Sequence, residues 1–120
     1  MRRKHHDLLA WQQGIALVKA IYSCTASFPR EEAFGLTSQM RRAAVSVPAN
    51  LAEGAARNST REFAHFFGIA RGSLSELETY LVIARELGYL KDTDELDQML
   101  DKVFKPLSGL LNAQKRRDQA

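Results

Sequence analysis

Apolar residues recur along most of this chain in steps of three and four, the spacing that places side chains on one face of an α-helix. They do so in four stretches, which predict helices over about residues 8–26, 37–56, 61–87 and 94–114. No stretch alternates apolar and polar residues as a half-buried strand would. The pattern therefore predicts an all-α protein.

The apolar stripes show which side of each helix we expect to face a shared core. Those of the second, third and fourth helices run through Val47, Leu74 and Leu107. The stripe of the first consists of Leu8, Trp11, Ile15, Val18, Tyr22 and, past the helix, Phe28. The third helix also carries a stripe of small residues, Ala64, Gly68, Gly72 and Ser75. Since each helical glycine costs about 1 kcal/mol, we expect another helix to approach closely there.

Local signals mark where the helices begin, end and bend. Asp7 can be the N-cap of the first helix, and Ser59 and Thr60 can cap the third. Gly88 is typical of a helix C-terminus. Pro48 and Pro106 fall inside the second and fourth patterns, where an interior proline kinks or splits a helix; we expect kinks. Short links between long amphipathic helices favour antiparallel neighbours, so residues 1–120 are predicted to form a single up-down-up-down four-helix bundle.

The composition, 45% hydrophobic and 26% charged, is that of a globular protein. The single cysteine, Cys24, cannot form an internal disulfide. No apolar h-region follows the charged N-terminus, and no stretch reaches the roughly 20 apolar residues of a transmembrane helix. We therefore expect a cytoplasmic protein without a membrane partner.

Candidate chemistry is sparse. Glu62 and His65 form one Glu-x-x-His pair, but a bundle with a di-metal centre needs two, and the other histidines, His5 and His6, lie at the N-terminus. No phosphate-binding glycine loop, nucleophile elbow or zinc-ligand spacing occurs. We interpret Cys24 as a small packed residue. The sequence predicts no cofactor, no metal and no enzyme activity.

A polar stripe runs along the second helix beside the apolar one. Its members are Gln39, Arg42, Ser46, Asn50, Glu53 and Arg57. One interpretation is a solvated face. However, short Ser46 and Asn50 suit a helix surface less well than lysine or glutamate. A mixture of amide, hydroxyl and charged groups suits a polar interface, so Gln39, Arg42, Ser46, Asn50 and Glu53 are candidates for an oligomer interface or a groove.

The net charge of +3 conceals a separation of charge that the predicted topology creates. The chain's start, the link between helices two and three, and the chain's end should share one pole, here called the basic pole. Its cations are Arg2, Arg3, Lys4, Arg57, Arg61, Lys115, Arg116 and Arg117, and its acids are Asp7, Glu53, Glu62 and Asp118. The opposite, acidic pole holds Glu31, Glu32, Glu86, Asp92, Asp94, Glu95 and Asp97 beside Arg30, Arg85 and Lys91.

Two interpretations of the basic pole remain open. Charged termini often serve solubility alone. Alternatively, clustered lysines and arginines suit a phosphate backbone that is contacted without base readout.

Several blocks of the sequence resemble a known family. They are Trp11, FP at 28–29, FGL at 34–36, QMRRAAVSVPANLAEG at 39–54, GSLSELE at 72–78 and LGYL at 87–90. Together they are similar to the small "four helix bundle protein" family, whose founders are encoded in intervening sequences of large-subunit ribosomal RNA genes. The accessory protein of diversity-generating retroelements is a relative.

The resemblance implies a ring-like homopentamer without enzyme activity. It points to RNA, or a nucleic-acid enzyme such as a reverse transcriptase, as the partner. The leading hypothesis is thus an oligomeric RNA-binding protein that uses the basic pole. The alternative is a protein-interaction scaffold with no nucleic-acid role.

Overall fold

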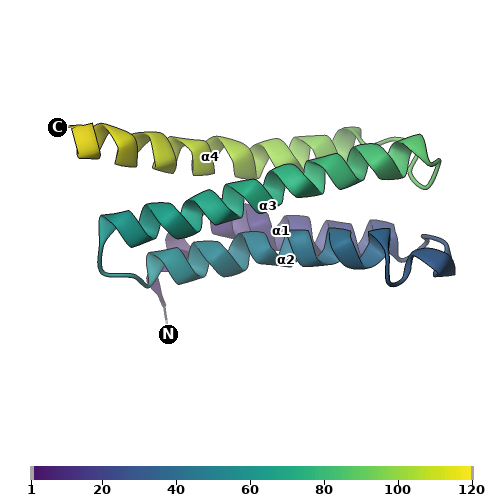
Figure 1. The fold of residues 1–120 in the computed structure, drawn as a ribbon, viewed down its shortest axis with the longest axis horizontal. Coiled ribbons are helices and arrows are strands. Elements are labelled where there is room, and N and C mark those ends of the chain that lie inside the picture. Colours follow the sequence, from purple (N-terminus) through teal and green to yellow (C-terminus); the bar gives the residue numbers. More distant parts are fainter. Residues whose placement is uncertain (1, 120) are drawn as a thin grey trace.

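The chain folds into four long helices, shown in Figure 1. The computed structural model describes residues 2–119, with side chains through Arg117. The long helices are α1 (Leu9–Thr25), α2 (Leu36–Ala55), α3 (Thr60–Glu86) and α4 (Asp94–Gln119). Short 3₁₀ helices, η1 (Lys4–Asp7) and η2 (Arg30–Glu32), precede α1 and α2. The described residues contain no strand, which confirms the all-α prediction.

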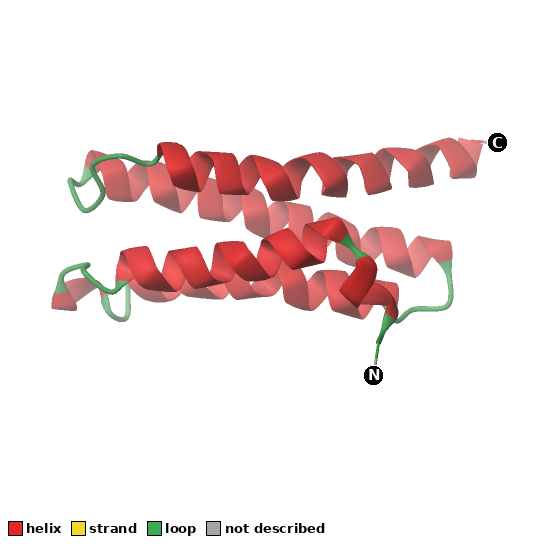
Figure 2. Cartoon of the chain, turned by 180° about the vertical axis from the view of Figure 1, so that it is seen from behind, coloured by secondary structure: helices red, strands yellow, loops and turns green. Residues whose placement is uncertain are grey.

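The four helices run alternately in opposite directions, as Figures 1 and 2 show from opposite sides. Helix α1 contacts α2 and α4, and α3 contacts the same two helices, whereas within residues 2–119 the diagonal pairs do not meet. This is the arrangement of an antiparallel four-helix bundle. Both chain ends and the α2–α3 link lie at one end of the bundle, and η2 and the α3–α4 link lie at the other.

The core confirms the stripes predicted for α2, α3 and α4. Val47, Leu74 and Leu107 have no exposed surface, and each lies among buried neighbours from the other helices. Each fully buried aliphatic side chain of this size contributes about 1.5–3 kcal/mol to folding. The core is therefore a continuous apolar layer along the bundle axis.

The stripe predicted for α1 is wrong in part: Phe28 is buried and Leu8, Trp11 and Val18 pack against the core, but two other members do not. Ile15 and Tyr22 are 46% and 44% exposed, and the helix instead buries Ala10, Gly14, Leu17, Ile21 and Thr25. Helix α1 is apolar on two adjacent faces, and the period alone does not say which face is covered. The small residue Gly14 lies against Pro48 and Val47 of α2. Thr25 is tolerated inside because its hydroxyl donates to the Ile21 carbonyl at 2.7 Å and accepts from Arg41 at 2.9 Å.

The helix ends agree with the sequence signals in two places and differ in two. The Ser59 hydroxyl accepts from the Glu62 amide at 3.1 Å, and Gly88 follows α3 with a φ of 81°, both as predicted. Asp7 is not the N-cap of α1; it lies in η1, and α1 begins after Leu8 without a side-chain cap. Helix α4 extends to Gln119 rather than ending near residue 114.

Two further expectations concern helix shape and packing. Pro48 and Pro106 lie inside uninterrupted helices, so neither helix splits, and the kinks remain a prediction. Among the described residues, the expected close approach does not occur at Gly68 and Gly72 of the small-residue stripe of α3. Carbon atoms built at Gly68 and Gly72 would have no neighbour within 4 Å, because this stripe is on the outer side of α3.

Candidate nucleic-acid interface

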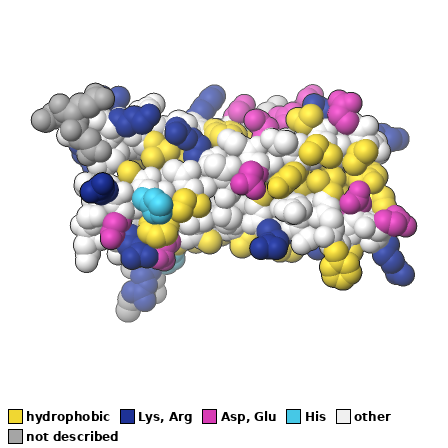
Figure 3. All heavy atoms as spheres, in the orientation of Figure 1, with side chains coloured by type: hydrophobic (Ala, Val, Ile, Leu, Met, Phe, Trp, Pro, Cys, Tyr) yellow, Lys and Arg dark blue, Asp and Glu magenta, His cyan; other side chains and the backbone are white. Residues whose placement is uncertain are grey.

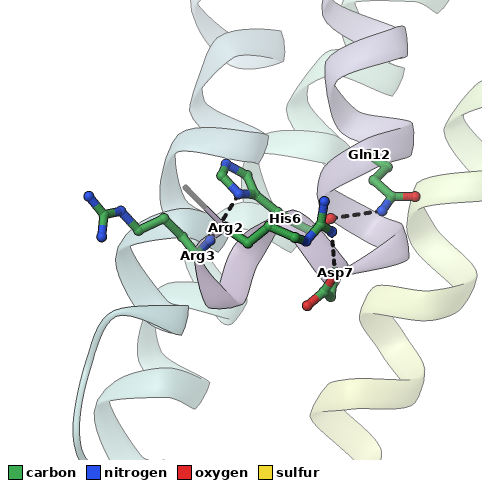
Figure 4. Close-up of polar contacts among 5 residues, drawn as sticks. All are labelled: Arg2, Arg3, His6, Asp7 and Gln12. Atoms are coloured by element: carbon green, nitrogen blue, oxygen red, sulfur yellow. Dashed lines mark hydrogen bonds and ion pairs between the residues drawn. The ribbon is translucent and has the colours of Figure 1, made fainter.

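The N-terminal cations are held on the bundle by the short helix η1, as Figure 4 shows. The Arg3 amide donates to Nδ1 of His6 at 3.0 Å, and the Gln12 side chain donates to the His6 carbonyl at 2.7 Å. Arg2 forms an ion pair with Asp7. The ring of Trp11 packs against His6, with centroids 5.3 Å apart. Residues that the sequence presented as a charged tail therefore belong to a folded segment.

This segment reaches the end of α2. Arg3, Lys4 and His5 line a hollow of about 340 Å³ together with the alanines of the last α2 turn, Ala52, Ala55 and Ala56. The small alanine side chains leave the cations close to the helix surface. The N-terminal part of the basic pole is thus joined to the α2–α3 link.

A second hollow joins that link to the end of α4. It measures about 200 Å³ and is lined by Arg57, Asn58, Ser59, Thr60, Phe63, Gln114 and Arg117. Arg57 pairs with Glu53, and its guanidinium lies 4.8 Å from the ring centre of Phe66. Because α4 is longer than predicted, Lys115, Arg116 and Arg117 are carried on a helix and not on a loose tail.

All eight predicted cations of the basic pole are exposed, and the structure brings them to one end of the bundle. Two of the pole's acids, Asp7 and Glu53, are engaged by Arg2 and Arg57. Within residues 2–117, no ion pair involves Arg61, Lys115 or Arg116. The side chain of Asp118 lies outside the described part. In Figure 3, lysine and arginine gather toward this end, and acidic side chains toward the other.

At the acidic pole, Glu32 connects the start of α2 to the α3–α4 link. Its carboxylate accepts from the Tyr89 hydroxyl at 2.9 Å and from the Leu36 amide at 3.2 Å. The hydrogen bond to Glu32, followed by burial, raises the pKa of Tyr89 above its ordinary value. The two ends of the molecule therefore differ in charge and in the contacts of their acidic residues: Asp7 and Glu53 form ion pairs, whereas Glu32 accepts hydrogen bonds.

The polar stripe of α2 follows the seam between α2 and α3. Asn50 donates to the carbonyl and hydroxyl of Ser46 at 2.8 and 2.9 Å, and the hydroxyls of Ser46 and Ser73 are 2.8 Å apart. Ser46 and Asn50 are half-buried, whereas Gln39, Arg42 and Glu53 are exposed. A polar groove lined by Gln39, Arg42, Ala43, Ser46, Ser73 and Glu76 opens there. Its covering by a neighbouring subunit remains a prediction.

Cys24 is next to last in α1 and lies at the opposite end of the bundle from the Glu62–His65 pair, which is at the start of α3. Glu62 and His65 are both exposed on the first turns of α3. Among the residues that the structure describes, no three His, Cys, Asp or Glu side chains come together to hold a metal ion. Cys24 is half-buried, and burial raises the pKa of its thiol.

Sequence reasoning missed several surface features. It did not find the hollow around Asn58 and Phe63, because that hollow needs the unpredicted last turn of α4. It did not find the packing of η1 on Trp11, because η1 is too short for a periodic signal. It used Phe34 only as part of a family motif and did not predict that this residue, which follows the acidic pair Glu31 and Glu32, is 99% exposed.

Comparison with known proteins adds the family. No helix among the described residues is long and apolar enough to cross a membrane. No curated protein matches the chain. Residues 6–109, most of the sequence, match the family described as 23S rRNA-intervening sequence protein. The helical bundle agrees with the resemblance seen in the motifs of residues 39–54 and 72–78. The chain belongs to the 23S rRNA-intervening sequence protein family.

Proposed function

We propose that this protein is a non-enzymatic, oligomeric RNA-binding protein of the cytoplasm and that its basic pole contacts the RNA. One observation carries the proposal: eight exposed cations from three separate chain segments meet at one end, while seven of the chain's 14 acidic residues belong to the other. The family's name, which refers to an intervening sequence of ribosomal RNA, supports RNA as the nucleic acid.

The proposed mechanism is electrostatic. Lysine and arginine side chains displace condensed counterions from the phosphate backbone, which favours binding and makes it strongly dependent on salt. Such contacts position the protein on the RNA without reading bases. Assembly into a ring, with five subunits as the family resemblance implies, would place several basic poles on one rim if the subunits are parallel, and their fields would add.

A titration of labelled structured RNA at several salt concentrations tests this function. The variant Arg61→Gln/Lys115→Gln/Arg116→Gln removes three cations of the basic pole that have no ion pair within residues 2–117. Removing one cation that contacts a phosphate should lower the slope of log affinity against log salt by roughly 0.7–0.9. The control, Arg30→Gln/Lys91→Gln/Arg85→Gln, removes the same charge at the acidic pole and should leave the slope nearly unchanged.

The outcomes separate the two functions. Binding that does not depend on salt, or no binding at low salt, would reject the RNA proposal. Equal losses of affinity in both variants would show that net charge matters and the basic pole does not. Either result would favour the scaffold function, in which a protein such as a reverse transcriptase is the partner. The exposed apolar residues Ile69 and Ile83 on α3, and Leu87 directly after it, give that second candidate some support.

A further inference from the structure

Phe34 is an aromatic side chain held in solvent on a well-ordered turn. It lies between η2 and α2, and its side chain is 99% exposed. The turn is fixed because the Gly35 amide donates to the Glu32 carbonyl at 3.0 Å. The Glu32 carboxylate in turn accepts from Leu36 and Tyr89. An exposed ring on a rigid turn has little conformational entropy to lose on binding, which is typical of an interface anchor.

A receptor for such a ring lies beside it, between α1 and α2. This hollow measures about 590 Å³ and is lined by Tyr22, Ala33, Phe34, Thr37, Ser38, Arg41, Arg42, Val45 and Ser46. Tyr22 and Val45 present exposed apolar surface to it. The Arg41 side chain is held in one position at the side of the hollow. Its guanidinium lies 4.5 Å from the Tyr22 ring centre, and its Nε donates a hydrogen bond to the Thr25 hydroxyl. The hollow is therefore preformed and has both apolar and cationic groups.

The charges around the ring and around the hollow are opposite. Exposed Glu31 lies three residues before Phe34, whereas exposed Arg42 lines the hollow. A nucleic acid is disfavoured as the occupant, because Phe34 lies at the acidic pole, where phosphates are repelled. A segment that pairs an aromatic ring with a carboxylate suits the hollow, and this chain supplies such a segment itself.

We propose that the occupant is a second copy of this chain: Phe34 of one subunit enters the hollow beside Tyr22 and Val45 of the next, and Glu31 faces Arg42 across the contact. Each subunit then gives one aromatic ring and receives one. The proposal rests on the oligomeric part of the proposed function and is independent of the RNA part.

The first test is Phe34→Ser, measured by light scattering after size exclusion and by sedimentation equilibrium. Removing a phenylalanine that is buried at the interface should raise the dissociation constant of each contact about 30- to 100-fold. Circular dichroism should show unchanged helix content, because the ring contributes almost nothing to the monomer's core. The control is Leu9→Ser, an exposed apolar residue at the start of α1, which should leave self-association unchanged.

The second test uses charge reversal. Glu31→Arg and Arg42→Glu should each weaken self-association, and the double variant should recover most of the wild-type affinity, because the pair is restored with exchanged signs. This recovery is not expected if Glu31 and Arg42 act separately.

The outcomes bear on the two proposals differently. Wild-type self-association in Phe34→Ser, an equal loss in Leu9→Ser, or no recovery in the double variant would overturn the contact. A wild-type protein that is monomeric at micromolar concentration would overturn both the contact and the oligomeric part of the function. The RNA titration separates failure of the contact from failure of the RNA proposal. The dissociated Phe34→Ser variant should still bind RNA with a salt-dependent affinity, since its basic pole is intact.

Discussion

At the scale of single residues, Gly54 shows how tightly α2 and α3 pack near the basic pole. A carbon atom built on Gly54 would lie 2.9 Å from Cδ1 of Phe67 and 3.0 Å from Cβ of Phe66. In the structure it is the last residue but one of α2, and it makes room for two aromatic residues of α3.

Gly54→Ala should therefore destabilise the protein by roughly 1–3 kcal/mol, because the added methyl group displaces the rings. Gly72→Ala is the matched control. Its added methyl group meets nothing within 4 Å, and the gain in helix propensity should stabilise the protein by up to about 1 kcal/mol. Urea unfolding followed by circular dichroism measures both changes. Equal effects of the two substitutions would contradict the packing described for Gly54.

Tyr89 should make the stability of the acidic pole sensitive to alkaline pH. Its folded-state pKa is raised by the hydrogen bond to Glu32, so the folded protein holds the phenol proton more tightly than the unfolded chain. The resulting stability is fully present below pH 10, about the unfolded value, and is lost as pH rises through the folded value.

The comparison is Tyr89→Phe, which keeps the ring on Phe28 but lacks the hydroxyl. Wild type should exceed the variant in unfolding free energy at pH 8, and this difference should shrink above pH 10. Urea unfolding of both proteins across this range measures it. A difference that stays constant with pH would show that the hydroxyl contributes nothing through its titration.

At the scale of elements, the seam between α2 and α3 carries a chain of hydrogen bonds from Asn50 through Ser46 to Ser73. Asn50→Leu removes one end of this chain. If a neighbouring subunit covers the seam, an unsatisfied polar group there costs about 1–3 kcal/mol, so self-association should weaken. Gln98→Leu, an exposed amide on α4, is the control and should not change self-association. Unchanged sedimentation of Asn50→Leu would show that the seam is only a solvated face.

Most of the fold could be predicted because the apolar periods of α2, α3 and α4 each have one possible buried face. Helix α1 could not, since Leu17 and Ile15 lie on adjacent apolar faces and only the packing against Pro48 selects between them. The end of α4 was also missed, because the polar residues after Gln114 continue the helix without an apolar period to show it.

The candidate site was predictable in outline for a related reason. Topology alone places the chain ends and the α2–α3 link at one pole, so the cations could be gathered without knowing any contact. The hollows between the cations depend on where individual side chains lie. Phe63 and Arg117 line one of them, and no sequence pattern specifies the positions of these side chains. The exposure of Phe34 was not predicted, because no sequence pattern tells whether an aromatic residue in a short link packs on the bundle or faces solvent.

At the scale of the whole molecule, the bundle is a rod of 49 × 31 × 21 Å with opposite charges at its two ends. The ends differ in how their charged residues are attached. Arg3 and Lys4 belong to a segment packed on Trp11 and α2, so deleting residues 1–7 should remove both cations and packing. Lys115, Arg116 and Arg117 instead project from the last turns of α4 and are exposed.

Ending the chain after Gln114 should therefore separate RNA binding from stability. The truncation removes three cations of the basic pole, so the slope of log affinity against log salt should fall by up to about 2–3. The free energy of unfolding should change by less than about 0.5 kcal/mol, as for other exposed positions. Deleting residues 1–7 should lower both the slope and the free energy of unfolding, because it removes three cations and the histidine rings that pack on Trp11. Salt-dependent RNA titrations and urea unfolding of the two truncated proteins give the four values. If truncation after Gln114 left the slope unchanged, the end of α4 would be no part of the RNA interface.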